Sequence, residues 1–125
     1  CPYCREMHRV NLAIPDIVEY IKTNFNVLQL NLWGDREVTD FDGETLSEKK
    51  FARKYRVMFT PTILFVDEKG EEVFRMPGYF KPFHFKHIFV YVKEEGYLTE
   101  PNFQRWLQAR ADEMRAAGQD FSIWD

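Results

Sequence analysis

The chain has 125 residues, of which 45% are hydrophobic and 30% charged, and its formal net charge is −3. This length suits a single domain with one core. The mildly acidic balance argues against a nucleic-acid partner, because no excess of Lys and Arg is available to neutralise phosphates. The longest wholly apolar run is about five residues, far short of the roughly 20 that cross a bilayer, so no membrane span is expected.

The first half of the chain is expected to contain a helix, a strand and a loop. Apolar residues recur with helical spacing from residue 4 to about 24, and Pro15 predicts a kink or two helices there. Residues 27–33 alternate leucine with polar residues, which predicts a strand. The stretch 34–44 predicts a loop that is solvated rather than calcium-binding, because its acids lack EF-hand spacing. Those acids are Asp35, Asp40, Asp42 and Glu44.

The middle of the chain predicts a helix followed by a β-hairpin. Thr45 and Glu48 form a capping box, which is expected to open a helix running to about Tyr55. The nearly continuous apolar run 62–66 is typical of a buried strand. Residues 72–76 predict a strand that pairs back antiparallel across an Asp-Glu-Lys-Gly turn.

Two further helices are expected toward the end of the sequence. One begins at Pro82 and is closed by Gly96, and the last begins near Thr99 and Pro101 and ends at Gly118. Two aromatic residues of the tail are candidates for docking on the domain, Phe121 and Trp124. Helices alternating with strands, then a hairpin, indicate an α/β sheet.

The two cysteines form the motif Cys1-Pro2-Tyr3-Cys4. At a helix N-terminus, unpaired amides and the helix dipole stabilise a thiolate, which makes Cys1 the candidate nucleophile. Cys4 lies one turn later and is the candidate resolver of a mixed disulfide. Pro2 suits the first turn because no amide hydrogen is needed there. The motif therefore predicts reversible thiol–disulfide exchange.

Two other interpretations of the cysteines stay open. Together with His84 and His87 they offer a Cys₂His₂ set for zinc, although structural zinc sites usually have clustered, well-spaced ligand pairs. They could also be inert core residues, but charged neighbours such as Arg5 and Glu6 argue against deep burial. The short loop between the cysteines adds little stability by chain entropy, so a scaffold role is not expected.

Several motifs together resemble the thioredoxin superfamily over residues 1–95. They are Cys1-Pro2-Tyr3-Cys4, Thr60-Pro61-Thr62-Ile63-Leu64-Phe65 and Pro77-Gly78-Tyr79. Within the superfamily, the break after the first helix and the long acidic loop are most similar to bacterial SoxW-type thioredoxins. The resemblance implies an α/β thioredoxin fold, a mixed sheet flanked by helices, with a thioredoxin-like domain over 1–98 and an extra C-terminal helical extension over 99–125.

The resemblance also carries expectations for the site. It implies that Cys1 and Cys4 are catalytic, that Pro2, Tyr3, Thr60 and Pro61 contact the substrate, and that Pro61 follows a cis peptide bond rather than the ordinary trans one. Protein thiols or disulfides would be the substrates and a protein the upstream electron donor. No metal and no cofactor beyond the Cys1–Cys4 disulfide are expected, and the location would be periplasmic or otherwise exported.

The start of the sequence bears on these expectations. Because a chain rarely begins at its reactive cysteine, we expect upstream residues to be missing, among them the N-terminal strand before Cys1 and any targeting signal. The intervening Pro-Tyr pair is that of glutaredoxins, so the direction of electron flow stays open. The alternatives are a glutathione-dependent, glutaredoxin-like reductase and a non-catalytic binding module with the same fold.

Overall fold

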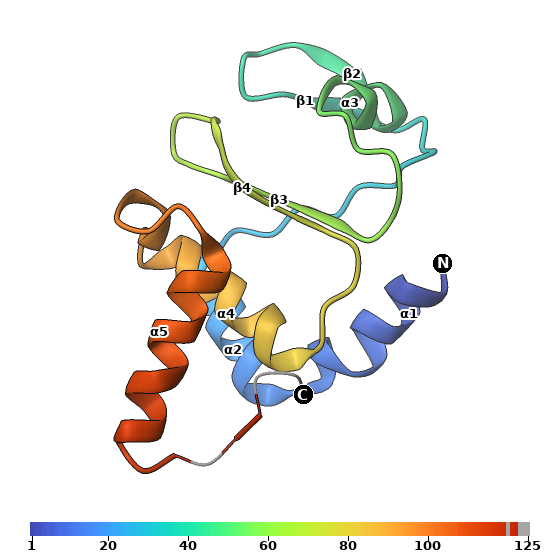
Figure 1. Cartoon of the computed structure of the whole chain (residues 1–125). Coiled ribbons are helices and arrows are strands. Elements are labelled where there is room, and N and C mark those ends of the chain that lie inside the picture. Colours follow the sequence, from blue (N-terminus) through green and yellow to red (C-terminus); the bar gives the residue numbers. More distant parts are fainter. Residues whose placement is uncertain (120, 123–125) are drawn as a thin grey trace. The chain divides into compact units, whose positions relative to one another are not determined.

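A computed structural model describes residues 1–119, 121 and 122 (Figure 1). The chain divides into two compact units. We call residues 1–6 and 25–79 the disulfide unit, and residues 7–24 and 80–125 the helical unit. No helix in the described part of the chain is long and apolar enough to cross a membrane.

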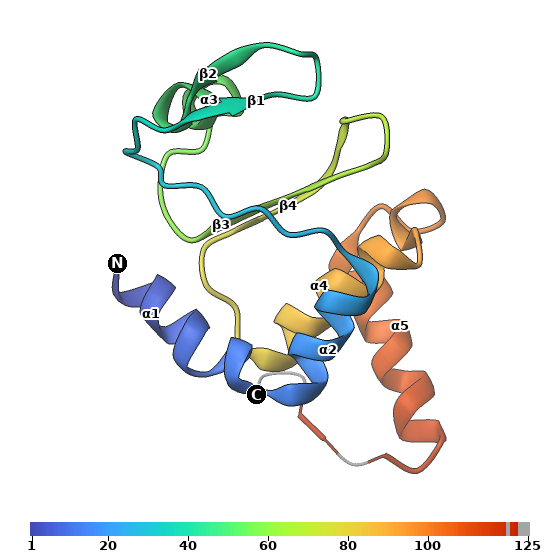
Figure 2. The same ribbon diagram turned by 180° about the vertical axis from the view of Figure 1, so that it is seen from behind.

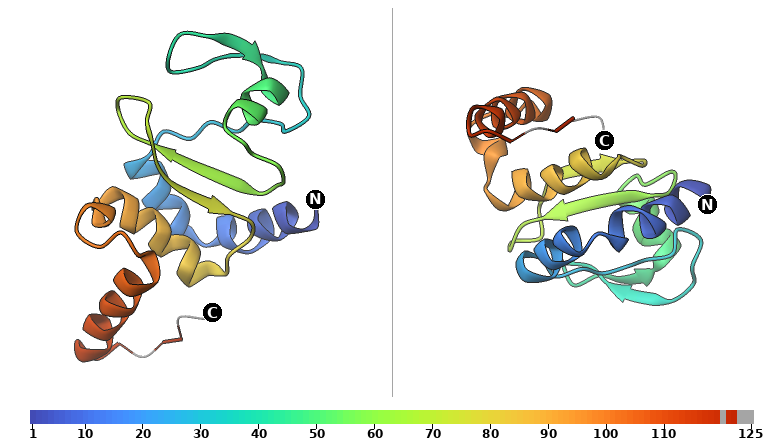
Figure 3. Two further views of the ribbon diagram at one scale, coloured as in Figure 1. Left: turned by 45° about the horizontal axis from the view of Figure 1, so that its top comes forward. Right: turned by 90° about the horizontal axis from the view of Figure 1, so that it is seen from below.

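The disulfide unit contains two antiparallel two-stranded sheets. In the larger one, β3 (Thr62–Val66) pairs with β4 (Glu72–Pro77), as Figure 3 shows. The turn between them is fixed by Asp67, whose Oδ1 accepts the backbone N–H groups of Lys69 and Glu71 at 2.9 and 3.0 Å. The predicted hairpin is confirmed, although only Phe65 of β3 is buried.

The smaller sheet corrects two expectations. Residues 34–44 are not all loop, since β1 (Glu37–Thr39) pairs with β2 (Thr45–Ser47). Because Thr45 lies opposite Thr39 in this ladder, it cannot cap the helix. The cap is Ser47, which accepts the N–H of Lys50, and α3 runs over Glu48–Lys54. The hairpin thus delays the helix start by two residues beyond the predicted cap.

The predicted strand at 27–33 is wrong. The segment between α2 and β1 is drawn as a plain light-blue trace in Figure 2 and has no strand assignment. A strand needs a neighbouring ladder, and the described strands pair only as β1 with β2 and β3 with β4. The alternation of Leu28, Leu30 and Leu32 is real, but Leu28 stays 71% exposed.

The start of the helical unit confirms the effect of Pro15. Helix α1 (Pro2–Arg9) begins in the disulfide unit, and a short 3₁₀ turn, η1 (Asn11–Ala13), follows it. Ile14 is extended, as expected for a residue before proline, and α2 (Pro15–Asn24) begins at the proline. Asn11 is fully buried and donates from Nδ2 to the carbonyl of Phe80 at 2.7 Å.

Helix α4 (Pro82–Lys93) is the centre of the helical unit, and α2 and α5 (Phe103–Ala116) pack against it (Figures 1 and 3). It is buried on nearly all sides, which explains why its sequence is apolar beyond a single stripe. The helix ends at Lys93, before the predicted Gly96, which opens the 3₁₀ turn η2 (Gly96–Leu98). A Cβ on Gly96 would lie 2.7 Å from the rings of Tyr91 and Trp106, so glycine is required for this packing.

The last helix is confirmed with a later start. Asn102 caps it by accepting the N–H of Arg105 at 3.0 Å, and Gly118, with φ +91°, follows its end. Phe121 docks by stacking on Phe83, with ring centroids 4.9 Å apart. Trp124 lies outside the described residues. The predicted domain boundary at residue 98 stays a prediction. Each compact unit combines two separate stretches of the chain, so the units do not test that boundary.

Candidate redox site at Cys1 and Cys4

Cys1 and Cys4 form a disulfide at the start of α1, with their Cα atoms 5.3 Å apart. The sequence folds as a helix here because Pro2 occupies its first position, and the first helical bond runs from the N–H of Arg5 to the carbonyl of Cys1 at 3.1 Å. Cys1 is exposed, whereas Cys4 is half-buried. Cys1 is therefore the more accessible of the two cysteines.

Two hydrogen-bond donors converge on the Cys1 sulfur. The backbone N–H of Cys4 lies 3.1 Å from Sγ, and the hydroxyl of Thr60 donates to it at 3.3 Å. The Thr60 carbonyl oxygen lies 3.5 Å from the same sulfur and would accept its proton in the reduced thiol. Donors aimed at a sulfur stabilise its thiolate, the form that attacks disulfides.

The Thr60–Pro61 peptide bond is cis, as the resemblance implied. Pro61 is buried, and its carbonyl accepts the N–H of Gly78 at 2.7 Å, which ties the loop to the end of β4. Thr62 adds a second hydrogen bond, which its hydroxyl donates to the carbonyl of Phe59 at 2.7 Å. The loop that carries Thr60 is therefore held on both sides of the cis bond.

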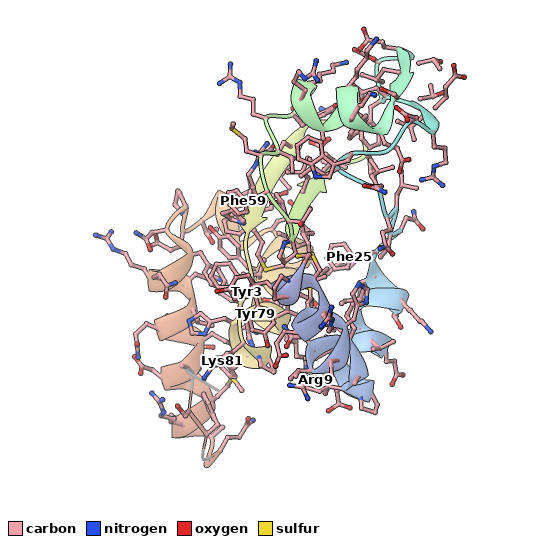
Figure 4. The ribbon with its side chains drawn as sticks, turned by 90° about the vertical axis from the view of Figure 1, so that its right-hand side faces the viewer. Tyr3, Arg9, Phe25, Phe59, Tyr79 and Lys81 are labelled. Atoms are coloured by element: carbon pink, nitrogen blue, oxygen red, sulfur yellow. A yellow bond between two sulfur atoms is a disulfide. The ribbon has the colours of Figure 1, made fainter. Side chains whose placement is uncertain are left out.

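Exposed aromatic side chains accompany the disulfide in this unit. Tyr3 comes from the first turn of α1 and Phe59 from the loop before β3 (Figure 4). Tyr3 is 63% exposed and Phe59 52%. Both predicted contact residues of the motif, Pro2 and Tyr3, are thus open to a partner.

Sequence reasoning missed a groove beside the disulfide. It has a volume of about 910 Å³ and is lined by Cys1, Thr60, residues 29–33, Arg36 and Glu48. The one sequence signal was Trp33, a large aromatic residue where the chain turns acidic and polar. Arg36 and Glu48 gave no indication that they line a groove, because their positions depend on the hairpin between them.

Three acidic side chains of the stretch 34–44 form ion pairs with Lys54 of α3. The Lys54 ammonium lies 2.5 Å from Asp40 Oδ2, 2.8 Å from Asp42 and 3.1 Å from Glu44. Tyr55 donates its hydroxyl to Asp40 Oδ1 at 2.6 Å. Burial of Asp40 alone would raise its pKa, but hydrogen bonds from Lys54 and Tyr55 outweigh it and hold that pKa below the usual value. The hydrogen bond to Asp40 raises the pKa of Tyr55 to about 12.

The zinc interpretation finds no supporting cluster. Within residues 1–119, 121 and 122, the side chains that converge closely enough for a metal are Asp40, Asp42 and Glu44, and they neighbour the Lys54 ammonium. His84 and His87 lie in α4, and Nδ1 of His87 is 2.9 Å from the carbonyl of Phe83. Burial lowers the pKa of His87.

Comparison with known proteins agrees with the fold and the motif. A family model described as a thioredoxin-like domain matches residues 1–93. The solved structure of a thioredoxin-fold protein from Helicobacter pylori superposes with a TM-score of 0.74 at 22% identity, covering 94% of this chain and 79% of that one. Among curated proteins we found no match. With three quarters of its length matched and a disulfide-bonded C-x-x-C at a helix start, the chain belongs to the thioredoxin-like family.

Proposed function

We propose that the protein is a thiol–disulfide oxidoreductase that reduces protein disulfides through Cys1 and Cys4. The observation that carries this proposal is the convergence of the Cys4 amide and the Thr60 hydroxyl on the exposed Cys1 sulfur. A purely structural disulfide needs no such donors. Cys4, half-buried one turn later, suits the resolving role.

The exchange balances in two steps. In the reduced protein, the Cys1 thiolate attacks a substrate disulfide, so a Cys1–substrate S–S bond forms and one substrate thiolate leaves. Cys4 then loses its proton and attacks the Cys1 sulfur, which restores the Cys1–Cys4 disulfide and releases the second substrate thiolate. Two electrons pass to the substrate, and a donor dithiol restores the starting state.

The remaining roles follow from the same geometry. Tyr3 and Pro2 would contact the substrate from the helix side, and Thr60 and Pro61 from the loop side.

We propose no cofactor beyond the disulfide, a protein dithiol as electron donor, and an exported, SoxW-like setting. The exported location is supported by the similarity of the break after the first helix and of the long acidic loop to SoxW-type thioredoxins.

Replacement of each cysteine tests the function. Cys1→Ser is expected to abolish dithiothreitol-driven reduction of insulin, whereas Cys4→Ser is expected to accumulate a mixed disulfide that mass spectrometry detects. Insulin reduction by Cys1→Ser at the rate of the parent chain would refute the assignment. Activity that requires glutathione rather than a protein dithiol would favour the glutaredoxin-like alternative.

The reduction potential of the Cys1/Cys4 couple tests the direction. A value near about −270 mV marks a thioredoxin-like reductant, which is the expected result, and one near about −120 mV marks an oxidant. The potential is measured by equilibrating the protein with glutathione or dithiothreitol buffers and trapping its free thiols.

A further inference from the structure

Trp33 is unusually open for a tryptophan. It is 79% exposed, although a side chain of this size is mostly buried on average in folded proteins. It lines the same groove as Cys1 and Thr60, so it borders the space that a molecule attacked by Cys1 would enter. Exposed aromatic residues beside a reactive group are typical of recognition surfaces.

The chain holds Trp33 in place by polar contacts. Its backbone N–H donates to Asn31 Oδ1 at 3.0 Å, and the backbone N–H of Asn31 donates to Glu48 Oε2 at 2.8 Å. Arg36 reaches the same carboxylate at 3.4 Å and the carbonyl of Gln29 at 3.2 Å. The segment is therefore anchored to the start of α3 although it belongs to no sheet.

Gly34 allows this anchoring. A Cβ at this position would lie 2.3 Å from Glu48 Oε1, too close for any side chain without displacing the carboxylate. The N–H of Lys49 also donates to the Gly34 carbonyl at 3.0 Å. Trp33 thus projects from a backbone that is anchored on both sides, and an anchored backbone loses less entropy on binding than a mobile one.

The charge of the groove indicates what it accepts. Among the groove-lining residues, the charged side chains are Arg36 and Glu48, which pair with each other. Their neighbours Leu30 and Leu32 are apolar and half-buried. A small anionic thiol such as glutathione would meet no cation there except one already paired. An uncharged, extended peptide segment fits this lining.

We propose that Trp33 is a specificity-determining residue that stacks on an aromatic side chain next to the attacked cysteine of a polypeptide substrate. This rests on the proposed function, because it requires Cys1 as the nucleophile. The bond changes are those of the exchange described above. Trp33 takes no part in them and acts on substrate preference alone.

Single-turnover kinetics with two peptide probes test the proposal. Each probe is a blocked pentapeptide whose central cysteine forms a mixed disulfide with 2-nitro-5-thiobenzoate. The residues flanking that cysteine are both Phe in one probe and both Gly in the other. The reduced full chain should release the chromophore about three to ten times faster from the Phe probe, the range expected for one aromatic contact. Trp33→Ala should bring this ratio to about one, and Trp33→Phe should restore most of it.

Phe41→Ala is the matched control. Phe41 is also exposed in the disulfide unit but does not line the groove, so its removal should leave the ratio unchanged. A parent chain with no preference, or a Trp33→Ala chain that keeps the full preference, overturns the proposal while leaving Cys1 as the nucleophile. Release by Cys1→Ser as fast as by the parent chain would instead refute the proposed function. Thermal unfolding of each variant checks that it is folded.

Discussion

The two compact units are stabilised by different means. Of the twelve buried hydrophobic side chains among the described residues, ten lie in the helical unit and two, Phe65 and Met76, in the disulfide unit. The helical unit has aromatic packing around Tyr91, which contacts Phe103 and Trp106 in edge-on geometry. The disulfide unit instead has polar anchors at Asp40 and Glu48.

The difference bears on where exchange chemistry can take place. Under the proposed function a partner must approach the sulfur, which requires open surroundings. Hydrogen bonds and ion pairs hold such a region in one conformation without covering it. Burial is concentrated in α4 and its neighbours, while the start of α1 with its disulfide belongs to the polar unit.

Loss of a core ring should have the largest effect. Phe85 is 1% exposed, and Phe85→Ala is expected to lower the free energy of unfolding by about 3–5 kcal/mol. Leu98, 68% exposed in the same unit, is the control, and Leu98→Ala should change it by no more than about 0.5 kcal/mol. Urea denaturation followed by circular dichroism measures both. Equal losses would contradict the claim that buried rings stabilise the helical unit.

Removal of the Asp40 charge should have an intermediate effect. Asp40→Asn removes the charge that pairs with Lys54 and replaces one of the two buried acceptor oxygens with an amide donor, and it is expected to cost about 1–3 kcal/mol at pH 7. Asp35→Asn is the control, since Asp35 is exposed and pairs with Lys49 alone, and it should cause no measurable loss.

The same carboxylate predicts a dependence on pH. Because the folded pKa of Asp40 lies below its unfolded value near about 3.9, its contribution is present above that value and is lost as pH falls through the folded pKa. Urea titrations between pH 6 and pH 2 should therefore show a smaller acid loss in Asp40→Asn than in the parent chain. An unchanged acid loss would mean that other carboxylates account for it.

Loss of the Thr60 hydroxyl should change reactivity and leave stability alone. Thr60→Val removes a donor from the Cys1 sulfur, so alkylation of the reduced Cys1 by iodoacetamide at pH 7 should slow by about three- to tenfold. Thr39→Val, an exposed threonine in the small hairpin, is the control and should react like the parent chain. A normal rate in Thr60→Val would show that the Cys4 amide suffices.

Periodicity was a reliable guide where an element packs against its neighbours. The apolar spacing from Phe85 to Val92 predicted α4, and the turn residues after Val66 predicted the β3–β4 hairpin. It misled at 27–33, where leucines alternate as in a strand but no ladder partner is present among the described residues. Alternation reports which faces are apolar, and pairing depends on residues far away in the sequence.

The residues of the candidate site also differ in whether local sequence could predict them. Cys1 and Cys4 follow from local spacing, because a C-x-x-C at a helix start places both sulfurs on one turn. The place of Thr60 beside the sulfur came from the family pattern. The lining of the groove could not be predicted, because Trp33 and Glu48 come to the same groove only after β1 and β2 pair and Ser47 caps α3.

The contact between Gly34 and Glu48 constrains how this sequence can diverge. A side chain at position 34 would displace the Glu48 carboxylate, which holds Asn31 and Arg36. Relatives that share the hairpin are therefore expected to prefer glycine here where glutamate is retained. At the hairpin turn the constraint is different: a Cβ on Gly43 would meet open space, but the φ of +89° favours glycine over any other residue.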